Sequence, residues 1–272
     1  MPGKIKHLIL IASGKGGVGK STVATNLALT FAHLGRRTGL LDADMYGPSI
    51  PTMFGASERP GSSDGQKIMP VEKFGLKLMS MGYMIEPDQA VVWRGPMLAG
   101  AVTQFVNDVE WGDLDYLIFD LPPGTGDIQL SLAQKFQVTG SVLVTTPQAV
   151  ALADVYRAKA MFDKVKIPVV GLVENMSYFV ADDGKEYDLF GRGGGARAAE
   201  EMGLELLGQI PIEPRIRECG DEGEPIVQRA PDSHSSEVFR TIAKRLDAKL
   251  EELEAERAAA NQGKGMLNII RD

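Results

Sequence analysis

Nine consecutive residues near the start of the chain are of the types that bind phosphate groups. They are Gly14-Lys15-Gly16-Gly17-Val18-Gly19-Lys20-Ser21-Thr22. The stretch from Gly14 to Ser21 fits the pattern G-x-x-x-x-G-K-[ST], whose glycines bring backbone N–H groups close to phosphate oxygens. Lys20 would place a positive charge at the β- and γ-phosphates, and the Ser21 hydroxyl would bind Mg²⁺. The pattern predicts a phosphate-binding loop for ATP and Mg²⁺; the alternative is an ordinary glycine-rich turn.

Acidic residues lie at the ends of two apolar runs. Residues 36–41 are typical of a strand and lead to Asp42 and Asp44, and residues 115–120 are typical of a strand that ends in Asp120. In an open α/β sheet, side chains at the carboxyl ends of strands face the ligand crevice. An aspartate opposite a phosphate-binding loop holds Mg²⁺ through water, and we expect this role for Asp120.

An amide side chain follows a third strand pattern. Asn175 comes shortly after the apolar run Val169–Val173. Its amide both donates and accepts hydrogen bonds, as an adenine edge requires. The alternative is that Asn175 caps the next turn.

Strands and helices alternate along the chain and would position these residues. Apolar runs predict strands at residues 8–12, 36–41, 76–81, 115–120, 141–146, 169–173 and 204–211. Helical spacing is found at residues 23–34, 97–106, 149–165, up to residue 202, and from residue 236. This order predicts an α/β fold with a mostly parallel sheet and helices on both faces. No linker or repeat divides the chain, so we expect one domain over residues 1–260 and a flexible tail at residues 261–272.

Composition excludes several classes of protein. Lysine and arginine number 29 against 36 acids, a net charge of −7, which argues against nucleic-acid binding as the main role. No apolar stretch approaches the roughly 18 residues of a membrane span, and no signal peptide is evident, so we expect a cytoplasmic protein without a membrane anchor. The single cysteine, Cys219, rules out an intramolecular disulfide. We expect Cys219 to be a structural thiol; the alternative is a labile bridging ligand.

Five segments together carry a resemblance to a known family. They are the loop with its second lysine, Lys15; Leu-Asp-Ala-Asp-Met-Tyr-Gly-Pro-Ser-Ile-Pro at 41–51; Trp-Arg-Gly-Pro-Met at 93–97; Asp-Leu-Pro-Pro-Gly-Thr-Gly-Asp at 120–127; and Glu-Asn-Met-Ser at 174–177. From about residue 5 to about residue 245 the chain resembles the Mrp/ApbC family of iron–sulfur cluster carrier ATPases. That family is related to the MinD/ParA proteins and shares their deviant Walker A loop.

The resemblance implies a P-loop NTPase fold and an ATP-dependent homodimer that transfers iron–sulfur clusters. The implied partners are cluster assembly proteins and client apoproteins. By this analogy Lys15 reaches across the dimer to the partner's nucleotide; the alternative is a solvent-facing lysine. Asp44 would position the attacking water. Asp42 and Asp120 would serve the Mg²⁺ shell, while Asn175 and Pro211 would flank adenine.

The sequence departs from the family in two ways. Many members begin with an extra small domain that this sequence does not contain. Members that hold a cluster carry Cys-x-x-Cys shortly after the Glu-Asn-Met-Ser segment, where this chain has Ala181 and Gly184. Since four-iron clusters are generally held by four thiolates, we predict no stable four-iron cluster on these positions. The ligands of any bound iron–sulfur cluster are not identifiable from the sequence.

Two other functions fit part of the sequence. One is a MinD/ParA-like switch that binds a membrane or nucleoid when loaded with ATP. The tail Met266–Asp272 has only Arg271 as a basic residue, however, and would be a poor membrane anchor. The other is a small-molecule kinase, which would not explain Lys15.

Overall fold

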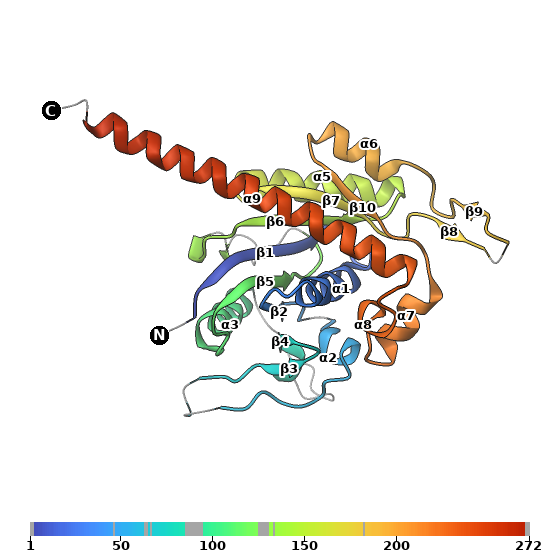
Figure 1. Cartoon of the computed structure of the whole chain (residues 1–272), viewed down its shortest axis with the longest axis horizontal. Helices are drawn as coiled ribbons and strands as arrows, with labels where there is room; N and C mark the ends of the chain where they lie inside the picture. The colour runs from blue at the N-terminus through green and yellow to red at the C-terminus, as the bar shows by residue number, and fades with distance from the viewer. Residues whose placement is uncertain are drawn as a thin grey trace.

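Strands from residues 5–209 form one central sheet (Figure 1). The structure is a computed structural model that describes residues 3–45, 47–62, 65, 67–84, 95–124, 131–132, 134–181 and 183–269. Within these residues the sheet has eight strands in the order β10-β7-β6-β1-β5-β2-β4-β3, all parallel to their neighbours except β3. The strands are β1 Ile5–Ser13, β2 Thr38–Asp42, β3 Val71–Lys73, β4 Leu76–Ser80, β5 Leu114–Asp120, β6 Gly140–Thr145, β7 Val169–Glu174 and β10 Leu206–Gln209.

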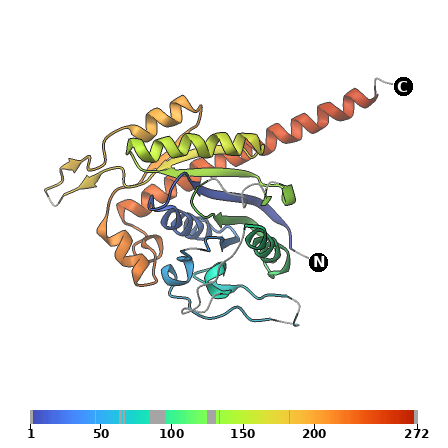
Figure 2. The same cartoon turned by 180° about the vertical axis from the view of Figure 1, so that it is seen from behind.

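Helices cover both faces of this sheet. They are α1 Lys20–His33, α2 Ile50–Met53, α3 Gly95–Asp108, α5 Ala149–Lys164, α6 Gly194–Glu201, α7 Pro214–Asp221, α8 Ile226–Arg229 and α9 His234–Ile269, with the 3₁₀ helix η1 at Met81–Met84. One face is covered by α1 and α9, which pack against each other. The view from behind shows α3 and α5 in front of the other face (Figure 2). This two-sided cover explains why the central strands are continuous apolar runs: in β1, Ile9, Leu10 and Ile11 are fully buried.

The C-terminal helix α9 lies across one face of the sheet and extends beyond it (Figure 1). Four residues of its predicted apolar stripe are fully buried: Phe239, Ile242, Leu246 and Leu250. Gly208 on β10 permits this close approach, since a Cβ there would lie 2.5 Å from Cγ1 of Ile242. The helix continues through Ile269, so residues 261–269 of the expected tail are helical. The flexibility of that tail remains a prediction.

A small hairpin projects from the sheet next to α6 (Figure 1). Its antiparallel strands are β8, Phe179–Val180, and β9, Glu186–Tyr187. Tyr178 joins it to the body through its carbonyl, which accepts a hydrogen bond from the Ile212 N–H. In the chain, the hairpin comes shortly after the Glu-Asn-Met-Ser segment, whose first residue is the last residue of β7.

The long strands and helices agree with those predicted from the sequence. Each predicted strand is present, with shifted ends such as Thr38–Asp42 in place of residues 36–41. The predicted α/β class with a mostly parallel sheet is confirmed. The helical spacing at residues 23–34 extends one residue too far, because α1 ends at His33 and Leu34 is 43% exposed. The short elements have no counterpart among the elements predicted from the sequence; they are α2, α7, α8, β3 and the β8–β9 hairpin.

Some residues of the family resemblance lie outside the described residues. They are Tyr46, Trp93-Arg94 and Thr125-Gly126-Asp127. In the part of the chain that is described, no helix combines the length and the apolar character needed to cross a bilayer.

Candidate functional site: a phosphate-binding cleft

The phosphate-binding loop connects the carboxyl end of β1 to the start of α1. Gly19 is the N-cap of α1 and has φ +79°, in the left-handed region that glycine adopts without strain. Lys20 begins the helix, so the loop presents its backbone N–H groups together with the positive end of the helix dipole. Gly14 and Val18 lie at the back of the loop: Gly14 packs on the backbone of Asp154 in α5, and Val18 is 2% exposed. The sequence correctly placed this loop between a strand and a helix.

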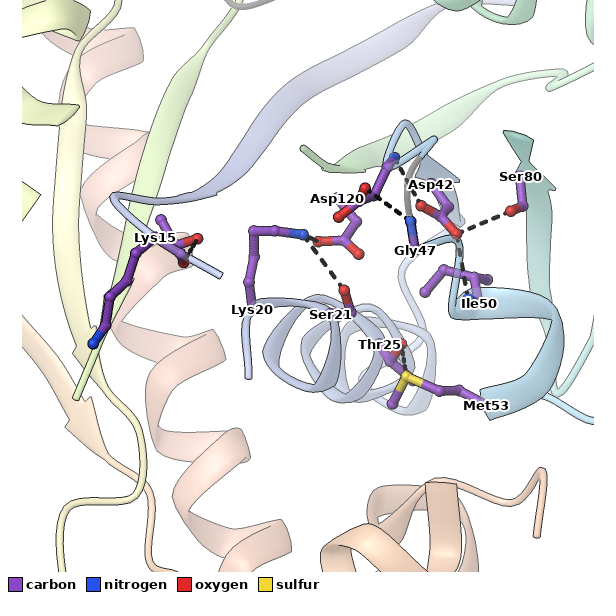
Figure 3. Close-up of polar contacts among 12 residues, drawn as sticks. Lys15, Lys20, Ser21, Thr25, Asp42, Gly47, Ile50, Met53, Ser80 and Asp120 are labelled. Atoms are coloured by element: carbon purple, nitrogen blue, oxygen red, sulfur yellow. Dashed lines mark hydrogen bonds and ion pairs between the residues drawn. The ribbon is translucent and has the colours of Figure 1, made fainter. Parts of the chain in front are cut away.

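Lys20 forms a buried ion pair at the base of the loop. Its Nζ lies 2.5 Å from Oδ1 of Asp120 and 3.4 Å from Oγ of Ser21 (Figure 3). Lys20 is 6% exposed and Asp120 is fully buried. The expected lysine and aspartate of the nucleotide site are thus in contact, although they lie a hundred positions apart in the chain. A bound phosphate would compete with Asp120 for the Lys20 ammonium.

Two carboxylates lie side by side beneath the loop, because Asp42 ends β2 and pairs with Asp120 at the end of β5. Burial raises the pKa of Asp42 to about 7, with a further contribution from the Asp120 charge. Burial also raises the pKa of Asp120, against the opposing effect of Lys20. Low dielectric and a like charge both favour the protonated form of a carboxyl group. A cation bound nearby would favour the ionised form of both carboxyl groups. The pair is therefore suited to hold a cation.

An unused oxygen marks where such a cation would fit. Oδ2 of Asp120 is buried and has no hydrogen-bond partner among the residues that the structure describes. Hard cations such as Mg²⁺ take oxygen ligands, and they usually keep several waters while using one or two carboxylates. Asp120 and the Ser21 hydroxyl supply that chemistry, with Asp42 behind them. When bound, Mg²⁺ would neutralise charge on the phosphates.

Asp42 is held in place by contacts that the sequence did not indicate. Its Oδ2 accepts hydrogen bonds from Ser80 Oγ at 2.9 Å and from the Ile50 N–H at 3.3 Å (Figure 3). Its Oδ1 accepts from the Asp44 N–H at 3.0 Å. Ser80 ends β4, the strand next to β2, so the rule that ligand groups collect at the carboxyl ends of strands could have found it.

Asp44 and Lys15 occupy different parts of the same cleft. Oδ1 of Asp44 accepts a hydrogen bond from the Gly47 N–H at 3.3 Å, in the loop after β2. The side chain of Lys15 points away from Lys20 and Asp120 (Figure 3). The Lys15 ammonium therefore does not join the Lys20–Asp120 ion pair, although Lys15 lines the cleft.

Asn175 reaches the phosphate-binding loop directly. Its Nδ2 donates a hydrogen bond of 2.9 Å to the Val18 carbonyl, and the residue is 6% exposed. The preceding Glu174, which the sequence analysis did not single out, is fully buried. Its carboxylate accepts hydrogen bonds from Ser177 Oγ at 2.6 Å, Gln209 Nε2 at 2.8 Å and the Gly195 N–H at 2.5 Å. This carboxylate thereby binds the N-terminus of α6.

A cleft of about 1040 Å³ brings most of the predicted residues together. Its wall includes Lys15, Gly16, Gly17, Gly19, Lys20, Ser21, Thr22, Asp44, Asn175 and Pro211. Asn175 and Pro211 lie on the wall with Met176 and Ile212, where a flat apolar group such as a nucleotide base could pack. Asp42 and Asp120 are buried below the cleft floor.

The positions of the missing Cys-x-x-Cys pair lie in the turn of the β8–β9 hairpin. The Ala181 N–H donates to the Lys185 carbonyl, and the Gly184 N–H donates to the Ala181 carbonyl. Neither residue offers a side-chain ligand.

Cys219 lies elsewhere, in α7, and is 1% exposed. Its thiol pKa is raised, chiefly by burial. In the part of the chain that is described, no group of three histidine, cysteine or acidic side chains is placed to hold a metal ion.

Several known proteins are similar to this chain in sequence. Residues 4–247 match the model of a family described as ParA: NUBPL iron-transfer P-loop NTPase. The iron-sulfur cluster carrier protein of Aquifex aeolicus is 53% identical over 254 residues, which cover 92% of this chain and 70% of the relative. The protein of the same name in Escherichia coli K12 is 49% identical over 248 residues, covering 90% and 67%. The Arabidopsis thaliana iron-sulfur protein required for NADH dehydrogenase, mitochondrial, is 48% identical, covering 92% and 80%.

Solved structures agree with the sequence relatives. A nucleotide-binding protein from Archaeoglobus fulgidus, in complex with ADP, superposes with a TM-score of 0.71 and 39% identity over 80% of this chain and 87% of that one. The cell division ATPase MinD of Pyrococcus furiosus gives a TM-score of 0.67 at 22% identity over 90% and 99%, which shows a common fold alone. The resemblance stated from the sequence motifs is therefore confirmed, and the chain belongs to the NUBPL iron-transfer family of ParA-type P-loop NTPases.

Proposed function

We propose that this chain is a dimeric ATPase that carries iron–sulfur clusters to client proteins or assists their assembly. As a P-loop NTPase of the ParA type, the chain is an ATPase. The observation that carries the cluster part is its identity of about one half, over nine-tenths of its length, to proteins named iron-sulfur cluster carriers. The MinD likeness supports the fold only, so no positioning function is proposed.

The proposed nucleotide site uses the residues at the cleft. Lys20 binds the β- and γ-phosphates once it leaves Asp120, and Ser21 binds Mg²⁺. Asp120 and Asp42 hold the water shell of the metal, as expected for carboxylates in this position. Asp44 orients the attacking water from the loop after β2. Asn175 and Pro211 flank the adenine.

Dimerisation supplies the remaining cation. Lys15 points away from the Lys20–Asp120 pair of its own chain, which supports a role at the nucleotide of a second copy. A cation delivered across an interface stabilises the charge that spreads over the γ-phosphoryl oxygens in the transition state.

The cluster itself is proposed as cargo whose ligands come mainly from other proteins. Ala181 and Gly184 provide no thiolate, and Cys219 is buried with a raised thiol pKa, which disfavours the thiolate that iron requires. Two cysteines per dimer would in any case fall short of the four thiolates usual for these clusters. A partner that contributes cysteines would complete the set.

The test combines nucleotide turnover with cluster delivery. Mg²⁺-dependent ATP hydrolysis and the activation of a four-iron apoenzyme by a supplied assembly scaffold protein are measured with wild type, Lys20→Ala and Lys249→Ala. Lys249 is a matched control because it lies on α9 and pairs with the exposed Glu252. We expect Lys20→Ala to lose hydrolysis and ATP-dependent delivery, and Lys249→Ala to keep both. Delivery that is unaffected by the wild-type protein would refute the cluster role, and wild-type turnover by Lys20→Ala would refute the site.

A further inference from the structure

Asn175 contacts the phosphate-binding loop at the Val18 carbonyl. Its Nδ2 donates to the Val18 carbonyl at 2.9 Å, and both residues are buried. The contact joins the carboxyl end of β7 to the loop after β1, two segments 157 positions apart. It therefore restrains the part of the loop that comes just before Lys20.

The hydrogen bond to the Val18 carbonyl also fixes the direction of the Gly19 N–H, which belongs to the same peptide unit. In a planar trans peptide the carbonyl and the N–H of the next residue point to opposite sides. Because the Val18 carbonyl is turned to Asn175, the Gly19 N–H is turned to the other side, toward the cleft that Gly19 lines. Backbone N–H groups at this position of a glycine-rich loop are the donors that cradle phosphates.

The packing around Gly19 makes the contact close. A Cβ on Gly19 would lie 2.2 Å from Nδ2 of Asn175 and 3.7 Å from Cε of Met176. Gly19 also has φ +79°, so two independent features require glycine there. The Asn175 amide thus fills the space that a side chain on Gly19 would need.

Asn175 is itself held rigidly by its neighbours. Its N–H donates to the Thr145 carbonyl at 2.8 Å, and Met176 follows in a left-handed conformation with φ +54°. On its other side, the buried Glu174 carboxylate is bound by Ser177, Gln209 and the N-terminus of α6. The amide therefore acts from a fixed support rather than from a mobile loop.

We propose that Asn175 is a positioning residue of the phosphate-binding loop, which aims the Gly19 N–H at the phosphates of the nucleotide. Binding of the phosphate part then depends on Asn175 whatever base is attached. This inference rests on the nucleotide site of the proposed function, and it assigns Asn175 a role separate from contact with adenine.

Binding of Mg·ATP, Mg·GTP and magnesium tripolyphosphate, which has no base, separates the two roles. Each affinity is measured by displacement of a fluorescent ADP analogue from wild type, Asn175→Ala, Asn175→Leu and Asn107→Ala. The leucine variant keeps the side-chain volume but has no donor, and Asn107 is an exposed residue on α3 that serves as the matched control. Thermal unfolding of each variant shows whether it is folded.

We expect both Asn175 variants to bind all three probes about tenfold more weakly, the order of magnitude of one hydrogen bond lost between the Gly19 N–H and a charged phosphate. Asn107→Ala should bind like wild type. A loss for ATP with unchanged tripolyphosphate binding would overturn the inference and leave adenine contact as the role. Unchanged binding of every probe would also overturn it. A wild-type protein that binds no Mg·ATP would instead contradict the proposed function, and the inference with it.

Discussion

Replacing Lys20 with methionine tests the buried ion pair in the absence of nucleotide. Lys20 Nζ and Asp120 Oδ1 are 2.5 Å apart, and Asp120 is fully buried. Methionine keeps most of the apolar stem and removes the charge. Removing one partner of a buried pair costs about 3–5 kcal/mol, because the other charge is left without compensation. Asp120 has one way to lower that cost, which is to take up a proton.

The cost of protonating Asp120 sets an upper limit on the loss of stability, and this cost depends on pH. Protonating a carboxyl group with an unfolded-state pKa of 3.8 costs 1.36 kcal/mol for each pH unit above that value, so about 4 kcal/mol at pH 7 and about 1.6 kcal/mol at pH 5. We therefore expect Lys20→Met to lower the free energy of unfolding by at most about 4 kcal/mol at pH 7 and at most about 1.6 kcal/mol at pH 5, because burial already raises the pKa of Asp120 in wild type. The direction agrees with burial, which raises the pKa of Asp120 while Lys20 opposes it.

Urea unfolding followed by circular dichroism, with EDTA and no nucleotide, measures these values. The double variant Lys20→Met with Asp120→Asn removes the buried charge, and it should recover most of the stability lost at pH 7. Asp120→Asn alone should be milder than Lys20→Met, because the Lys20 ammonium can turn toward the open cleft. Equal unfolding midpoints for wild type and Lys20→Met at both pH values would refute the reasoning. So would a double variant no more stable than Lys20→Met.

Three further predictions concern the dimer, the thiol and a buried histidine. Lys15→Ala and Asp44→Ala subunits should each be nearly inactive but recover ATP hydrolysis when mixed, since one site of the mixed dimer keeps both groups; no recovery despite proven mixed dimers would contradict the trans role. After anaerobic reconstitution and desalting, wild type and Cys219→Ser should both lack a four-iron cluster by iron and sulfide analysis, and a cluster that survives in wild type would count against us. Burial lowers the pKa of His7 from 6.5, so wild-type stability should fall as pH drops below 6.5, where the unfolded chain binds a proton that the folded chain disfavours. His7→Phe, which keeps a ring stacked on Tyr116, should lose less stability between pH 7 and pH 5 in the same urea assay; an equal loss would show that His7 is not responsible.

The sequence predicted the centre of the molecule well because local patterns determine it. A continuous apolar run marks β1, glycines and Lys20 mark the loop, and an apolar run ending in an acid marks β5. These signals are contained within a few residues each, so they do not depend on the rest of the fold. The assignment of Asp120 to the nucleotide site followed from the same rule that places ligands at strand ends.

Contacts between distant segments were beyond the reach of those patterns. Ser80 binds Asp42 only because β4 lies next to β2 in the sheet. Asn175 offers the groups that adenine needs, and the sequence could not show that its donor is used by the Val18 carbonyl. The short helices α7 and α8 are stabilised by packing rather than by a long apolar stripe, so their periodicity was too brief to detect.

The long helix α9 has a consequence for how the chain folds during synthesis. Its buried side chains, among them Phe239 and Leu250, cover α1, β7 and β10, while Arg36 and Tyr116 from early segments bind Asp247 on the helix. Strand β1 is also a central strand of the sheet, and it pairs with β5 more than a hundred residues later in the chain. Pairings this distant close slowly, and a nascent chain without α9 leaves one sheet face open to other apolar surfaces. The segment from β1 through the buried part of α9 must therefore be synthesised before the core can close.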